Sequence, residues 1–335
     1  FGSTKRVGKS FSVFKLHVQK EEFDISLPVR NKKDEPYLGI REALRRRDLT
    51  INAMAYDPLT KRLFDPFHGK RDLKEGILRA TDPETFVEDP LRVFRVAQFA
   101  ARLSFTIDDS LKKLCRDISL SHVSAERLST EFHKMWLKSP KPSIGLKAMR
   151  ELKLFSRLFP RWKNGSEKEV CDAVDRVVPV LMDKPYKLAL FWVAALHKTP
   201  SADAEEVLTR LKIFSIENVN VKRIILFALQ CHNRLHSRCT DTDLRRLSEE
   251  GSLLFLFTVF EILHNQKPQD LIDRAKQLHI YSKSLPILLQ GRDLLPLGIK
   301  GKEIGTKLAE LRRLQVEGLI TNREKALSWI KRDLT

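Results

Sequence analysis

A helical repeat of apolar residues runs from Pro90 almost to the C-terminal end, and it constrains the fold more than any other feature. Apolar side chains recur at intervals of three or four residues, which is the period of a helix with one buried face. No strand is expected in roughly the last 230 residues. The expected helices cover 90–103, 108–118, 124–137, 143–153, 167–182, 185–197, 203–212, 217–235, 241–249, 252–264, 268–278, 302–315 and 321–332.

Short strands are expected in the N-terminal part. Residues 10–30 alternate apolar and polar side chains, which favours strands at about 11–18 and 22–27 joined by a polar turn. Residues 40–57 begin as a helix and end in a stretch that suits either helix or strand. A loop-rich stretch follows, with a short strand expected near Leu63–Phe64. The predicted fold class is therefore α+β, a small mixed part followed by a long all-α body.

Composition limits the compartment. Four cysteines in 335 residues are too few for a disulfide framework, which favours a reducing compartment, and we expect a cytoplasmic location. No apolar run reaches the ~18 residues of a membrane span, and the sequence opens without a secretory signal. It also opens without methionine, so we expect it to be the remainder of a longer protein.

The charge balance points to a polyanionic partner. Lys and Arg outnumber Asp and Glu by 61 to 43, which gives a net charge of +18 and a pI near 9.8. Basic residues are spread along the whole chain, so the surface that meets a nucleic acid is expected to be extended. The alternative is a solvated basic surface that aids solubility.

The stretch EDPLRVFR, residues 88–95, has two interpretations. Asp89 before Pro90 is typical of a helix start, with Asp89 as the N-cap that satisfies the free N–H of Arg92. Glu88 would add favourable charge at that helix end. Arg92 and Arg95 are not explained in this way, because cations in the first turns of a helix are unfavourable.

The second interpretation is a site that recognises a nucleobase. A carboxylate accepts from an exocyclic amino group, and a guanidinium donates to ring nitrogens and carbonyls. An Asp89/Arg92 pair one turn apart suits the edge of cytosine or adenine and rejects uracil and guanine. Arg95 would hold the triphosphate.

A second polar cluster lies in RRRDLTINAMAYDP, residues 45–58. One interpretation is a basic helix end followed by a buried strand, with Asp48 as a cap. The other places Arg46 or Arg47 on phosphate and Asp48 or Asn52 on a ribose hydroxyl.

Five ordered motifs give the chain a resemblance to a known family. They are RRDLTINAMAYDP, FDPFHGKRDLKEGILRA, FVEDPLRVFRVAQFAARLSF, HVSAERLSTEF and the C-terminal stretch 291–331. Together with residues 7–30, which fit strands of the family's head domain, they resemble the class II tRNA nucleotidyltransferase/poly(A) polymerase superfamily, which includes the CCA-adding enzymes. The resemblance covers nearly the whole chain.

The resemblance implies roles for individual residues. Asp89 and Arg92 fall on an EDxxR motif that acts as a protein template for CTP and ATP. Asp65, Gly69 and Asp72 match DPxxGxxDL, which positions the site, and Ser124, Glu126 and Arg127 match a motif that braces the nucleotide-binding helix. The residues expected to bind nucleotide are Arg46, Arg47, Asp48, Asn52, Glu88, Asp89, Arg92 and Arg95.

Two departures from the family pattern stand out. The GGxVRDxLLG segment and its DxD carboxylates, which should precede Phe1, are absent from this sequence. Asp24 matches a third acid, but one carboxylate does not make a two-metal Mg²⁺ site, so the chain as written is not expected to catalyse alone. The loop NKKDEPYLGI, residues 31–40, is also shorter than in CCA-adding members, which is the pattern of enzymes that add only CC.

The resemblance implies transfer of CMP and AMP from CTP and ATP to a tRNA 3′ end, and binding of the acceptor–TψC arm by the helical part. A CC-adding or A-adding enzyme, a poly(A) polymerase and a non-catalytic RNA-binding relic remain alternatives. The expected domains are a partial head (1–78), a neck that recognises the base (79–160), a helical body (161–285) and a tRNA-binding tail (286–335).

Two histidine-containing stretches are expected to be structural. Some relatives carry a metal-dependent His-Asp pair where this chain has His197-Lys198, so His197 is interpreted as a helix-end residue of a core helix. In CHNRLHSRC, His232 and His236 would share a helix face. However, the spacing matches no zinc motif, and a helix end facing RNA or solvent is favoured.

Overall fold

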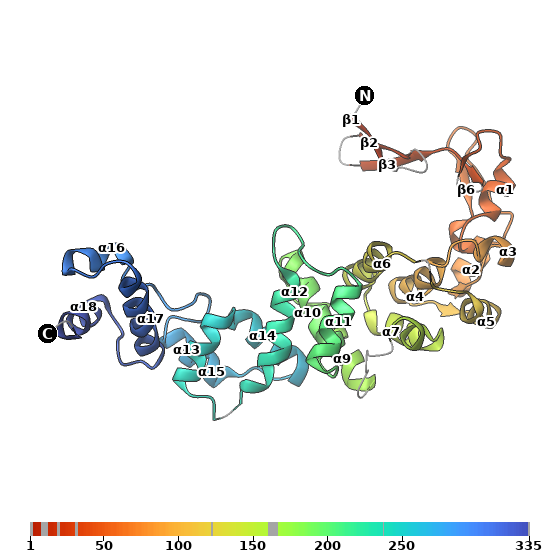
Figure 1. Cartoon of the computed structure of the whole chain (residues 1–335). Coiled ribbons are helices and arrows are strands. Elements are labelled where there is room, and N and C mark those ends of the chain that lie inside the picture. The colour runs from red at the N-terminus through yellow and green to blue at the C-terminus, as the bar shows by residue number, and fades with distance from the viewer. Residues whose placement is uncertain are drawn as a thin grey trace. The chain divides into compact units, whose positions relative to one another are not determined.

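The computed structural model describes residues 3–7, 13–18, 21–30, 33–121, 123–159, 167–236 and 238–333. The chain divides into two compact units, Phe1–Phe159 and Pro160–Thr335. All strands of the described residues lie in the first unit, whereas helices make up the second, coloured green to blue in Figure 1. The fold class is α+β, as predicted.

The N-terminal strands form small antiparallel sheets. β1, β2 and β3 pair in that order, with Phe14 opposite Ile25, so the two strands expected from the alternating pattern are confirmed. Residues 19–20 of the expected turn lie outside the described residues. The hairpin of β6 and β7 confirms the strand near Leu63–Phe64. The bounds are β1 (Ser3–Val7), β2 (Val13–Val18), β3 (Glu21–Ser26), β4 (Val29–Arg30), β5 (Lys33–Asp34), β6 (Ala55–Asp57) and β7 (Arg62–Phe64).

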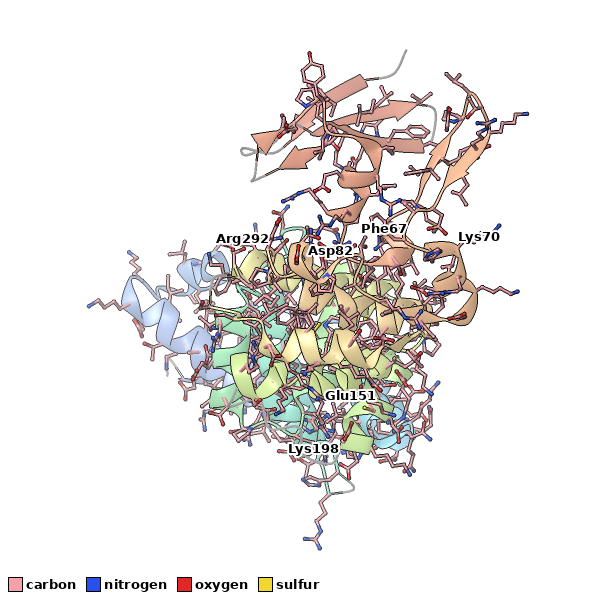
Figure 2. The ribbon with its side chains drawn as sticks, turned by 90° about the vertical axis from the view of Figure 1, so that its right-hand side faces the viewer. Phe67, Lys70, Asp82, Glu151, Lys198 and Arg292 are labelled. Atoms are coloured by element: carbon pink, nitrogen blue, oxygen red, sulfur yellow. The ribbon has the colours of Figure 1, made fainter. Side chains whose placement is uncertain are left out.

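The helices of the first unit pack around α4, which contacts both α6 and α7. Asp82, labelled in Figure 2, starts α3 by accepting a hydrogen bond from the Thr85 N–H at 3.0 Å. The bounds are α1 (Ile40–Arg45), the 3-10 helix η1 (Thr50–Asn52), α2 (Gly69–Glu75), α3 (Pro83–Phe86), α4 (Arg92–Leu103), α5 (Asp109–Asp117), α6 (Ala125–Lys138), α7 (Pro142–Glu151) and α8 (Leu154–Leu158).

Two expectations for this unit are wrong. Residues 57–73 were expected to be loop-rich, but the end of this stretch belongs to α2, because Asp65 accepts hydrogen bonds from two N–H groups of its first turn. The helical region also contains a strand. β9 (Thr106–Ile107) pairs in parallel with β8 (Ile77–Leu78), and two residues are too short to display a strand pattern.

The second unit is built around a helix that is buried from Leu188 to Leu196. α10 is apolar on all sides and packs against α9, α12 and α14, as expected for a helix at the centre of a core. The bounds are α9 (Glu167–Val177), α10 (Lys184–Leu196), α11 (Ser201–Arg210), α12 (Val221–Cys231), η2 (His232–Arg234), α13 (Asp241–Glu250), α14 (Leu253–His264), α15 (Gln269–Gln277), α16 (Gly291–Leu294), η3 (Leu295–Leu297), α17 (Lys302–Val316) and α18 (Arg323–Asp333).

Several predicted helix ends in this unit are wrong. α9 stops at Val177, five residues earlier than expected, because Pro179 cannot continue the hydrogen-bond ladder. α12 begins at Val221 rather than at 217, because Glu217 and Asn218 adopt positive φ. α12 also ends at Cys231 rather than at 235, and the short α16 was not expected.

The stretch CHNRLHSRC is a helix end, as expected, but the expectation that its groups face RNA or solvent is wrong for His232. His232 begins η2 and lies buried with its Nδ1 3.0 Å from the Ala228 carbonyl, whereas His236 lies beyond the helix. All four cysteines of the chain are buried free thiols. Among the residues that the structure describes, no helix is long and apolar enough to cross a membrane.

His197 ends the central helix and makes stability depend on pH. It follows α10, and its Nδ1 lies 2.9 Å from the Ala194 carbonyl, next to the Lys198 labelled in Figure 2. Burial lowers the pKa of His197 to about 4, whereas an unfolded histidine has a pKa near ~6.5. Between these values the unfolded chain binds the extra proton, so stability falls as the pH falls from about 6.5 towards 4.

We expect a shift from pH 7.5 to pH 5 to lower the free energy of unfolding of the second unit by about 2 kcal/mol through His197. Urea unfolding of the full chain at both pH values measures the change. A His197→Asn variant, which has no imidazole to protonate, should lose less stability over the same interval. An equal loss in both proteins would contradict this assignment.

Candidate functional site

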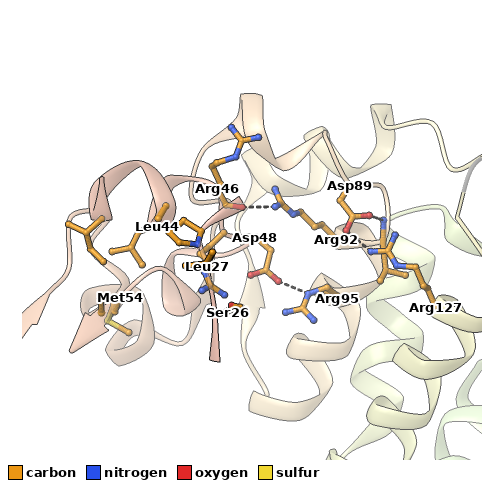
Figure 3. Close-up of a pocket in the computed structure, with 16 residues that line it drawn as sticks. Ser26, Leu27, Leu44, Arg46, Asp48, Met54, Asp89, Arg92, Arg95 and Arg127 are labelled. Carbon is orange, nitrogen blue, oxygen red and sulfur yellow. Dashed lines mark hydrogen bonds and ion pairs between the residues drawn. The ribbon is translucent and has the colours of Figure 1, made fainter. Parts of the chain in front are cut away.

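A cavity of about 720 Å³ lies in the first unit, where the end of α1 faces the start of α4. Figure 3 shows guanidinium and carboxylate groups from both segments pointing into it, with Arg127 of α6 beside them. The polar lining residues are Ser26, Arg46, Arg47, Asp48, Asp89, Arg92, Arg95 and Arg127. The apolar ones are Leu27, Pro28, Ile40, Ala43, Leu44, Met54, Ala55 and Leu91.

The lining carries a net positive charge. Five arginines and two aspartates face the cavity, which favours an anionic ligand. Among the described residues, the exposed side chain of Arg47 has no hydrogen-bond or ion-pair partner. Arg46 is already engaged, because its Nη2 donates to Glu88 Oε2 at 2.6 Å. Arg47 is therefore the guanidinium best placed to take a phosphate.

Arg92 ties the two sides of the cavity together. Its Nη1 donates to the Thr85 carbonyl and its Nη2 to the Arg46 carbonyl, both at 2.6 Å (Figure 3 shows the second bond). Burial lowers the pKa of Arg92, but a guanidinium stays charged in proteins. Two of its five N–H groups are used in this way, so three remain for a ligand.

Asp89 is held by Arg127. Its Oδ2 accepts from Arg127 Nη2 at 2.6 Å, and its Oδ1 accepts from the Leu91 N–H at 3.2 Å. Burial acts to raise the pKa of Asp89, but the hydrogen bond and charge of Arg127 outweigh it and lower the pKa. The group is therefore an ionised acceptor at neutral pH. Each carboxylate oxygen can accept a second hydrogen bond, so capacity for an amino group remains.

The expectation that Asp89 is the N-cap of the following helix is wrong. α4 begins at Arg92 with Leu91 at the N-cap position, and the Leu91 side chain makes no capping bond. The Arg92 N–H donates to the backbone carbonyl of Asp89 at 3.0 Å rather than to its carboxylate. The Asp89 side chain therefore lines the cavity instead of closing the helix end.

The buried Asp48 and the partly exposed Arg95 form an ion pair across the cavity. Arg95 Nε donates to Asp48 Oδ2 at 2.6 Å, and Asp48 Oδ1 accepts from the Leu49 N–H and from Asn52 Nδ2. Glu131, which is 3% exposed, lies 3.9 Å from Arg95 Nη1. Sequence reasoning missed Glu131. The signal for it is an acid on the apolar face of the helix expected at 124–137.

Of the residues expected to bind nucleotide or metal, three lie outside the cavity lining. Glu88 binds Arg46 and Asn52 binds Asp48, so each contacts a lining residue rather than the cavity itself. Asp24 lies on the exposed β3, where it pairs with Lys15 at 3.4 Å.

The remaining expected residues support neighbouring elements. Ser124 is the N-cap of α6 and accepts from the Arg127 N–H at 3.4 Å, and the Glu126 carbonyl accepts from two hydroxyls of the same helix. Asp72 accepts from Thr50 Oγ1 at 2.7 Å and also pairs with Arg79. Ser124 thus caps the helix that carries Arg127, and Asp72 holds Thr50 of η1.

The described residues do not form a metal site. No group of three or more His, Cys, Asp or Glu side chains among them is placed to hold an ion. Asp24 supplies one exposed carboxylate that faces a lysine, which does not match the donor set of a two-metal Mg²⁺ centre.

Comparisons with known proteins identify three segments. Residues 4–79 match the family described as "Poly A polymerase head domain", residues 104–165 match "Probable RNA and SrmB- binding site of polymerase A", and residues 186–330 match tRNA nucleotidyltransferase domain 2. A "Multifunctional CCA protein" of Vibrio parahaemolyticus is 38% identical over 170 residues, 46% of this chain and 41% of that protein. A "CCA-adding enzyme" of Hamiltonella defensa is 38% identical over 172 residues, 47% of this chain and 42% of that protein.

Solved structures share the fold. The Bacillus stearothermophilus CCA-adding enzyme in complex with CTP superposes with a TM-score of 0.74 at 22% identity, covering 99% of this chain and 84% of that one. The Thermotoga maritima enzyme complexed with tRNA gives 0.62 at 22% identity, covering 100% and 82%. The chain spans about two fifths of the length of the curated relatives that it matches. Its matched segments and its fold show that the chain belongs to the class II tRNA nucleotidyltransferase/poly(A) polymerase superfamily.

Proposed function

We propose that the chain acts in a tRNA nucleotidyltransferase that adds CCA to tRNA 3′ ends without a nucleic-acid template. CTP and ATP donate CMP and AMP, and pyrophosphate is released. One observation carries the proposal: Asp89 and Arg92 line the same cavity as Arg46 and Arg47. A base-recognising pair and phosphate-binding cations are thereby combined in one cavity large enough for a nucleotide.

In this proposal the Asp89/Arg92 pair selects the base. The Asp89 carboxylate, kept ionised by Arg127, accepts from the amino group of cytosine or adenine. The three N–H groups left on Arg92 donate to the adjacent ring nitrogen or carbonyl. Uracil and guanine present a carbonyl where the amino group should be. Their carbonyl oxygen would face the Asp89 carboxylate, and neither group can donate a hydrogen bond.

The other expected residues hold the nucleotide or its surroundings. Arg47 takes a phosphate, and the Asp48–Arg95 pair keeps the end of α1 against α4. If Mg²⁺ assists the transfer, Asp24 is the residue of this chain that the resemblance assigns to it, and the ion needs further carboxylates. Bound Mg²⁺ would serve to activate the 3′-hydroxyl of the primer.

The helical part is proposed to bind the acceptor–TψC arm of tRNA, for which the net charge of +18 is suited. Residues 1–78 would form the head, 79–160 the neck, 161–285 the body and 286–335 the tail. The cytoplasm is the proposed location, in keeping with free thiols at all four cysteines.

A titration of the full chain with each of the four ribonucleoside triphosphates tests the proposal. We expect CTP and ATP to bind at least tenfold more tightly than UTP and GTP, because a wrong base leaves Asp89 without its donor. Equilibrium dialysis with labelled nucleotides measures the four affinities. Equal affinities, or no binding of any of them, would refute the template role.

A further inference from the structure

A second cavity, of about 470 Å³, lies within the helical unit and far along the sequence from the first one. It forms where the starts of α10 and α12 meet the junction of α13 and α14, with residues 282–284 at its border. Its volume falls in the range of ligand sites in proteins. None of the roles assigned above uses it.

The two acids at this cavity are neutralised by arginines that do not line it. Glu249 accepts from Arg312 of α17 through both carboxylate oxygens, at 2.7 and 2.8 Å. Glu250 accepts from Arg234 Nη1 at 2.9 Å through each oxygen. Their negative charge is therefore compensated from outside the cavity.

The two cations of the lining are not compensated in this way. Arg223 of α12 and Lys283 are both exposed, and among the described residues neither side chain has a hydrogen-bond or ion-pair partner. The Ser252 hydroxyl accepts from the Phe255 N–H at 3.3 Å, so its own proton remains available to donate. Two free cations and a hydroxyl donor favour an anion at this place.

Three aromatic residues also line the cavity. Tyr186 and Phe255 lie with ring centroids 6.3 Å apart, and Phe227 lies against the junction between α13 and α14. That approach needs Gly251, because an added Cβ would come within 2.6 Å of the Phe227 ring. Phe255 is buried, whereas Tyr186 and Phe227 are partly exposed. Partly exposed rings beside uncompensated cations suit a nucleotide, whose base or ribose would cover the rings while its phosphate meets the cations.

We propose that this cavity binds the phosphate of a nucleotide, as a phosphodiester of RNA or as a free nucleotide. The net positive charge of the chain favours RNA over a free nucleotide as the source of this phosphate. That the RNA is tRNA rests on the proposed function. The cavity would anchor the RNA in the second unit and fix which stretch of its backbone contacts that unit. Its residues are separate from those that select the incoming base.

The test uses the full chain with Arg223→Gln and Lys283→Gln combined. The probes are a tRNA transcript that lacks its CCA end and the mononucleotide CMP. We expect the variant to bind the transcript about tenfold more weakly, because two phosphate-binding cations are lost, and the slope of log K against log salt to fall by about 2. Fluorescence anisotropy at several salt concentrations measures both quantities. CMP binding is measured by dialysis.

The matched control is Arg238→Gln combined with Lys267→Gln, which removes two exposed cations of the same unit outside the cavity. Weaker binding in the cavity variant alone supports the RNA source. If the cavity variant alone binds one CMP fewer per chain than the parent, the result supports a free nucleotide as the ligand. Equal losses in both variants, or no loss in either, would overturn the proposal. The parent chain could also show no preference for CTP and ATP while the cavity variant still binds RNA more weakly. That result would refute the proposed function and leave the cavity proposal intact.

Discussion

A chain carrying Asp89→Asn is expected to bind CTP and ATP roughly 10- to 100-fold more weakly and to lose most of its preference over UTP and GTP. The substitution keeps the shape of the side chain but replaces one acceptor oxygen by an NH2 group, which can only donate. It also removes the charge that pairs with Arg127 at 2.6 Å. Competition dialysis with all four nucleotides measures both the affinity and the preference.

Glu88→Gln is the matched control for this prediction. Glu88 is the neighbouring acid, but it binds Arg46 and does not line the cavity. Its variant should keep the preference for CTP and ATP within a few-fold, while tRNA affinity stays near that of the parent chain in both variants. If Asp89→Asn lowered tRNA affinity and left nucleotide preference intact, Asp89 would be an RNA contact.

The spacing of apolar residues along the sequence predicted most helices and strands of this fold. The helical period from Pro90 onwards and the alternation in residues 10–30 both predicted structure that is present. The errors lie at ends and in short pieces. Pro179 ends α9 before the apolar pattern stops, and β9 has two residues, too few to show a period.

The contacts at the site were less accessible to sequence reasoning. Periodicity explains pairs three or four residues apart, but Asp89 meets Arg127 38 residues later, and Asp48 meets Arg95 47 residues later. The resemblance implied nucleotide contacts for Asp48, Asp89 and Arg95 and a bracing role for Arg127, but it did not indicate which of these residues bind one another. These pairings affect ligand binding, because an arginine already paired with a buried carboxylate has fewer N–H donors left for a phosphate.

Gly69→Ala is expected to destabilise the first unit by about 3 kcal/mol. Asp65 caps α2 by accepting from the Gly69 N–H at 2.7 Å, which brings the start of this helix against η1. A Cβ at residue 69 would overlap the Thr50 carbonyl oxygen and come within 2.8 Å of its carbon. Both are backbone atoms, so no side-chain rotation relieves the overlap.

The same substitution should also weaken nucleotide binding, because Thr50 lies two residues from Asp48. Thr50 is tied to Asp72 by a hydrogen bond of 2.7 Å, and its displacement would move the carboxylate that holds Arg95. Thermal unfolding of the full chain and CTP dialysis below the transition measure the two effects. Gly39→Ala is the control, since a Cβ there meets nothing within 4 Å and the residue has an ordinary φ of −61°. Equal stability of the two variants would show that η1 and α2 can separate without cost, and Gly69 would then have no part in positioning Asp48.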